Sequence, residues 1–177
     1  MIIVGLLVFY VFLVFGFVGG NTGAYRVSEL RHYFHKATKS AETSADFHEL
    51  MAAYDGREPK VLAFKAASEA VMAKYTWNPS SKLKHLRTSA ALFEQAVKLD
   101  DDDPEIRFLR YTIQYHIPKY LNMSSNIEED RRIVMNSLFG YPKSGLDPEP
   151  CKIMRDVLLK GDLCSAQEKQ QLRTIKI

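Results

Sequence analysis

Apolar side chains recur every three to four positions along most of the chain after Tyr25. This spacing puts them on one face of an α-helix, which can then bury that face against its neighbours. No segment alternates apolar and polar residues convincingly with the two-residue period of a half-buried strand. The pattern therefore predicts an all-α fold, organised as a small array of antiparallel helical hairpins.

Three segments in the middle of the chain show the helical period most clearly. Residues 60–75 have two apolar faces, which predicts a helix packed between neighbours, with alanines allowing close approach. Residues 82–99 carry one continuous apolar stripe, and residues 104–116 carry two opposed apolar faces. Asp103 is placed to cap the last of these helices, and Pro104 suits its first position.

Weaker signals predict helices at both ends of this central part. Residues 26–54 read as one or two helices, with Ser44 as the expected N-cap of the second. Two capping-box patterns, one starting at Ser125 and the other at Ser165, open helices near residues 127–139 and after 165. Another helix is expected over residues 152–160, and Pro79 is expected to keep residues 76–81 out of the helices on either side.

The N-terminal segment differs sharply from this body. Residues 1–25 contain no Lys, Arg, Asp or Glu, and residues 2–18 are almost wholly Ile, Val, Leu and Phe. As a helix, residues 2–18 would span about 25 Å, the lower end of the transmembrane range. Small residues follow at 19–24, as in the cleavage region of a signal peptide. Residues 1–24 are thus predicted to be a signal peptide or a membrane anchor.

The two readings of the leader give different locations for the body, residues 25–177, which we expect to be a single helical domain. A cleaved leader makes the protein exported, periplasmic or extracellular. An uncleaved one anchors it in the membrane through residues 2–18, and the basic residues after the leader would then hold the body on the cytoplasmic side. The 24 basic and 21 acidic residues are interspersed without a basic stripe, so no nucleic-acid partner is predicted.

Two resemblances accompany these patterns. Ser89, Phe93 and Ala96 lie in the second predicted helix where tetratricopeptide hairpins place a small residue, an aromatic and an alanine, so residues 60–116 resemble a divergent hairpin of that type. The loop around Trp77 is too long for that pattern, Pro104 comes about three residues late, and no second copy is visible. Residues 75–130 resemble an uncharacterised family of exported bacterial all-helical proteins, which implies export and a helical body but no activity.

Candidate chemistry in the sequence is sparse. His32 and His35 share a helix face, but no HExxH motif or cysteine pair accompanies them, so we predict no metal site, no cofactor and no catalytic residue. Cys151 and Cys164 would lie at opposite ends of a helix, more than about 12 Å apart along its axis. A disulfide needs Cα atoms within about 7 Å, so free or buried thiols are expected.

The remaining candidates favour a binding role. Trp77, Arg107, Arg110 and Tyr111 are of the residue types that anchor interfaces, and we predict that they contact a protein or peptide partner. The sequence is most consistent with an exported, non-catalytic helical binding or scaffold protein. Two alternatives stay open: a metal-dependent enzyme that uses histidines, and a bitopic membrane protein with a helical soluble domain.

Overall fold

The computed structural model describes residues 23–177, and the predicted leader segment at residues 2–18 lies outside the described part. Within residues 23–177 the chain forms eight α-helices and one short 3-10 helix, with no strand, which confirms the all-α class. The elements are α1 (Val27–Ala37), α2 (Ala41–Ala52), α3 (Pro59–Tyr75), α4 (Pro79–Leu99), α5 (Pro104–Tyr115), η1 (Lys119–Leu121), α6 (Ile127–Phe139), α7 (Pro148–Lys160) and α8 (Ala166–Thr174).

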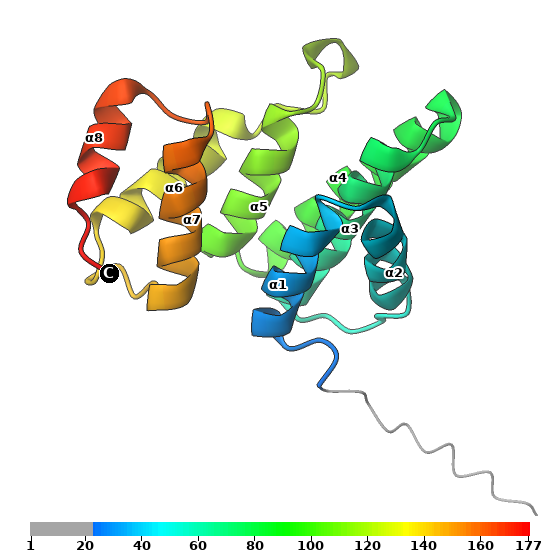
Figure 1. Cartoon of the computed structure of the whole chain (residues 1–177), viewed down its shortest axis with the longest axis horizontal. Helices are drawn as coiled ribbons and strands as arrows, with labels where there is room; N and C mark the ends of the chain where they lie inside the picture. The colour runs from blue at the N-terminus through cyan, green and yellow to red at the C-terminus, as the bar shows by residue number, and fades with distance from the viewer. Residues whose placement is uncertain (1–22) are drawn as a thin grey trace, which may run out of the picture.

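Helix α5 joins two hydrophobic clusters. Figure 1 shows α1 to α4 on one side of α5 and α6 to α8 on the other. Ile106 and Leu109 of α5 belong to the cluster formed with α1 to α4, and Phe108 and Tyr111 belong to the cluster formed with α6 to α8. The two opposed apolar faces predicted for this segment are therefore both buried.

Helix α3 occupies the centre of the first cluster. It contacts α1, α2, α4 and α5, and nine of its 17 residues are buried. Small side chains such as Ala63, Ala66 and Ala67 are fully buried there, which lets the neighbouring helices approach closely. The prediction of a helix packed between neighbours is confirmed.

Two helix starts follow the predicted chemistry. The Asp103 carboxylate accepts hydrogen bonds from the amides of Glu105 and Ile106, and Pro104 occupies the first turn of α5. The capping box at Ser165 is formed, with Glu168 closing it at the start of α8. Both features satisfy amides that have no partner within the helix.

Three predicted start signals are wrong, and α7 starts at Pro148 rather than at residue 152. Ser40 rather than Ser44 caps α2, and Ser44 is buried inside that helix. Asn78 caps α4 and Pro79 starts it, so the loop between α3 and α4 is only residues 76–78. Proline needs no amide partner at the first helical position, which makes Pro79 a start signal there rather than a break.

The third correction concerns the start of α6, where the predicted capping box at Ser125 is not formed. The N-cap is Asn126, whose side chain makes no cap hydrogen bond. Asn126 instead exchanges two hydrogen bonds with the buried Gln114 side chain of α5. A contact between helices thus takes the place of a local cap.

Candidate functional site

A groove of about 780 Å³ lies between α1 and α7, with α3 and α5 contributing to its lining. Part of α4 and the segment after α5 also line it. In Figure 1 these helices lie around the centre of the molecule, with α1 and α7 on opposite sides of α5. The groove therefore lies between the two hydrophobic clusters that α5 joins.

The groove has an apolar lining. Phe64, Phe108, Leu109 and Met154 line it and are almost fully buried. On α7, Ile153 and Val157 also line it, yet they are 39% and 38% exposed. These two side chains lie one helical turn apart, so they form an exposed apolar edge along one wall.

Basic side chains outnumber acidic ones around the groove. Arg31, Lys74 and Lys82 line it, and Glu105 is its one carboxylate. Desolvation and the charge of Lys39 lower the pKa of His35, another lining residue, which disfavours its charged form. The rim therefore carries a net positive charge beside an apolar floor.

Arg31 links three helices at one end of the groove. Its Nε and Nη2 donate to the two carboxylate oxygens of Glu105 on α5, at 2.6 and 2.9 Å. Its Nη1 donates to Glu149 on α7 at 2.7 Å. The hydrogen bond with Glu105 raises the pKa of Arg31, which stays charged. This side chain holds α1, α5 and α7 together and sets the spacing of the groove walls there.

Three of the four residues predicted to contact a partner are buried instead. Arg107, Arg110 and Tyr111 are only 4%, 1% and 1% exposed, which conflicts with a role as surface anchors. Both arginines bind Asp130 of α6, and Arg110 does so through two nitrogens, Nε at 2.7 Å and Nη2 at 2.8 Å. Arg107 and Arg110 were predicted to contact a partner protein. Instead they form contacts inside this protein, between α5 and α6.

The Tyr111 hydroxyl lies in the second cluster and donates a hydrogen bond to the carbonyl oxygen of Leu163. Burial raises the pKa of Tyr111 to about 12. A folded-state pKa above the unfolded value near 10 contributes stability that is complete below pH 10 and is lost as the pH rises towards 12.

We expect the free energy of unfolding to fall roughly 1 kcal/mol more between pH 9 and pH 11 in the wild-type chain than in Tyr111→Phe. The substitution also removes one hydrogen bond, but that loss is the same at both pH values. Urea unfolding followed by circular dichroism at the two pH values measures the difference. Equal losses in the two proteins would show that Tyr111 titrates normally.

Trp77 is the one predicted contact residue at the surface. It lies in the loop between α3 and α4 and is 98% exposed. It does not line the groove. Its contact with a partner stays a prediction, and it would act outside the groove.

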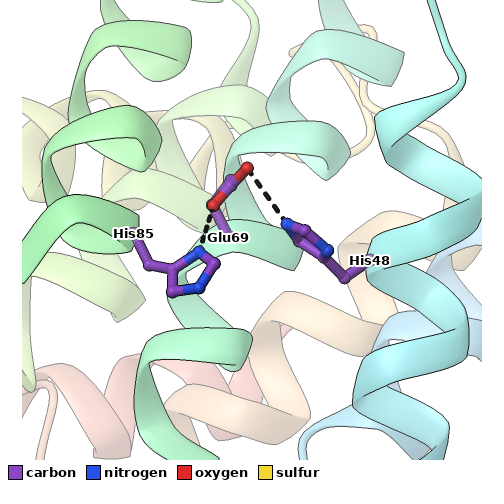
Figure 2. Close-up of side chains that lie close together, drawn as sticks. All are labelled: His48, Glu69 and His85. Carbon is purple, nitrogen blue, oxygen red and sulfur yellow. Dashed lines mark hydrogen bonds and ion pairs between the residues drawn. The ribbon is translucent and has the colours of Figure 1, made fainter. Parts of the chain in front are cut away.

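The histidines are placed differently from the expectation. His32 and His35 lie on α1 and belong to no group of three potential ligands among the residues described, whereas His48, Glu69 and His85 come together from α2, α3 and α4. Figure 2 shows the Glu69 carboxylate between the two imidazole rings. This is the one group of residues in the 23–177 range whose geometry could hold a metal ion. Sequence inspection missed it because its members share no local spacing.

Both cysteines are free thiols, Cys151 buried in α7 and Cys164 half-buried after it. Among residues 23–177, no helix combines the length and the apolar character needed to cross a membrane.

No protein-family model, curated protein or solved structure matches the chain. The site geometry itself is therefore the basis for a functional proposal.

Proposed function

We propose that this protein is a non-catalytic binding or scaffold protein whose groove takes an amphipathic helix with acidic residues from a partner protein. The observation that carries the proposal is the 780 Å³ groove with an apolar lining and a net positive rim. Amphipathic helices bind such grooves by inserting apolar side chains at positions i, i+3, i+4 and i+7. The partner's acidic residues would then face the lysines.

The charges on the rim favour an acidic partner for a specific reason. Lys74 and Lys82 are exposed, and Glu105 is already engaged by Arg31. Lys74 donates a hydrogen bond to the carbonyl oxygen of Thr38, and neither lysine forms an ion pair within residues 23–177. An acidic helix therefore meets two unpaired positive charges and no free carboxylate in the groove lining. Complementary charge of this kind accelerates association and sets orientation, while the apolar floor supplies most of the affinity.

The finer architecture and the location belong to the same proposal. Helices α3 and α4 are joined by three residues, a short loop that supports a tetratricopeptide-like hairpin. We place the protein outside the cytoplasm after cleavage of the leader, with anchoring through residues 2–18 as the alternative. N-terminal sequencing of the protein from its host distinguishes a cleaved leader from an anchor, because a first residue near Asn21 or Tyr25 requires cleavage.

A labelled helical peptide tests the groove directly. The probe has about 15 residues, with Leu at the i, i+3, i+4 and i+7 positions and Glu on the flanks. We expect the full chain to bind it and the double variant Ile153→Gln, Val157→Gln to bind about tenfold more weakly, since both side chains would lose apolar burial. Fluorescence anisotropy measures the Kd, and a peptide with Lys in place of Glu should bind more weakly.

Leu99→Gln is the matched control, because Leu99 is 52% exposed and lies outside the groove lining. It should leave the Kd unchanged. Trp77→Ala shows whether the partner reaches beyond the groove. Unchanged affinity in the α7 double variant would contradict the proposal. Laurate, a small acidic amphiphile, serves as a second probe. If laurate binds in the groove and the peptide does not, the groove takes a small amphiphile rather than a partner helix, and the proposal is wrong.

A further inference from the structure

We propose that His48, Glu69 and His85 form a binding site for a divalent transition-metal ion, with Zn²⁺ as the ion that best suits its ligands. The ion would connect α2, α3 and α4. None of the three residues lines the groove, so this site is separate from the proposed function. The sequence predicted no metal site, and the proposal rests on the folded arrangement alone.

The ligand atoms are already close together. Nε2 of His48 lies 3.1 Å from one Glu69 oxygen, and Nδ1 of His85 lies 2.6 Å from the other. One ligand atom from each residue can be chosen so that all three lie within 4.8 Å of one another. Ligands around a tetrahedral zinc ion, each about 2.0–2.1 Å from the metal, are roughly 3.3 Å apart. Side-chain rotations of small size would therefore bring the three atoms into a coordination shell.

The helices fix these residues in place. Helix α3 packs against both α2 and α4, and Glu69 on α3 projects between the histidines of the other two helices (Figure 2). The side chains of His48, Glu69 and His85 are 26%, 16% and 22% exposed. They are thus held by packing, and each side chain remains partly exposed to solvent.

The Nε2 atom of His48 is the second observation that points to a ligand. It is buried, and within residues 23–177 no hydrogen bond of good geometry reaches it. It lies 3.1 Å from a Glu69 oxygen, a contact that is an ion pair only when the imidazole is protonated. Buried polar atoms without a partner are rare, because their lost hydration is not replaced. A hydrogen-bonded triad accounts for His85, which hydrogen-bonds to Glu69. A neutral His48 imidazole gains from the same carboxylate only a 3.1 Å contact outside hydrogen-bond geometry. A metal ion bound by the nitrogen lone pair would satisfy it.

The ligand types select the class of metal. Two imidazole nitrogens and one carboxylate suit Zn²⁺ and related first-row ions, whereas Ca²⁺ and Mg²⁺ favour oxygen ligands. With three protein ligands, a fourth position would be left for water. Binding through Nδ1 of His85 releases to solvent any proton that this nitrogen shares with Glu69.

Calorimetric titration of the full chain with Zn²⁺, after removal of metal with a chelator, tests the site. We expect one ion per chain and an affinity at least about tenfold weaker in Glu69→Gln and in His85→Gln. His32→Gln and His116→Gln are matched controls, since both histidines are exposed and outside the group, and they should bind like the wild type. Far-ultraviolet circular dichroism checks that each variant keeps its helices.

Three results would overturn the proposal: no Zn²⁺ binding by the wild type, wild-type affinity in both ligand variants, or loss of binding in His32→Gln. The last would assign the ion to a surface site on α1. If the ligand variants fail to fold, Co²⁺ added to the wild-type chain decides. The intense visible absorption of four-coordinate cobalt supports the site, and the weak spectrum of the hexaaqua ion overturns it.

Discussion

Replacing Asp130 by alanine should lower the free energy of unfolding by about 3–5 kcal/mol, the largest effect we expect from a single substitution outside the hydrophobic clusters. The Asp130 side chain is fully buried and binds both Arg107 and Arg110, which are buried as well. Without the carboxylate, two guanidinium groups stay in the interior with their charge uncompensated on that side. Urea unfolding followed by circular dichroism measures the loss.

Two further variants make this result specific to the buried network. Glu128→Ala removes another carboxylate from α6, but Glu128 is 86% exposed and forms only a surface ion pair with Arg131. It should change stability by less than about 1 kcal/mol. The triple variant Arg107→Met, Arg110→Met, Asp130→Leu should recover most of the lost stability, because it removes all three buried charges together. A loss below about 1 kcal/mol in Asp130→Ala would mean that water reaches the network.

The helices could be predicted from the sequence because their signals are local. The repeat of apolar residues over 60–75 and 104–116 identifies α3 and α5 and even their two buried faces. Single-residue boundary signals were less reliable. Ser44 and Ser125 have suitable chemistry, but Ser44 is buried in the interior of α2 and the start of α6 is held by Gln114. Packing between helices determines where such helices start, and this packing cannot be recognised from the residues next to the start.

The candidate site could not be predicted, for a related reason. The groove gathers lining residues from Arg31 on α1 to Val157 on α7, and His48, Glu69 and His85 come from three helices. Arginine and tyrosine are common both in interfaces between proteins and in buried polar networks. Residue type alone therefore could not place Arg110 or Tyr111 inside the domain. Trp77, in the loop between α3 and α4, is the one of these four candidates that lies at the surface.

The second large effect is expected at the end of the groove, where Arg31→Ala should cost roughly 2–3 kcal/mol of stability. The Arg31 side chain is 13% exposed and its partner Glu105 only 7%, so the substitution leaves a nearly buried carboxylate without its two hydrogen bonds. The same change removes the ion pair between Arg31 on α1 and Glu149 on α7. We therefore also expect weaker binding of the acidic helical probe. Urea unfolding and fluorescence anisotropy measure the two effects.

Glu149→Ala separates the two roles of Arg31. Glu149 is 57% exposed, so its ion pair is screened by water and its loss should cost less than about 1 kcal/mol. It leaves the bond between Arg31 and Glu105 intact but still removes the link between α1 and α7. If the spacing of the groove walls matters for the partner, this variant binds the probe more weakly while remaining almost as stable as the wild type. Unchanged affinity in Glu149→Ala would show that packing alone, without the link to Arg31, fixes the wall formed by α7.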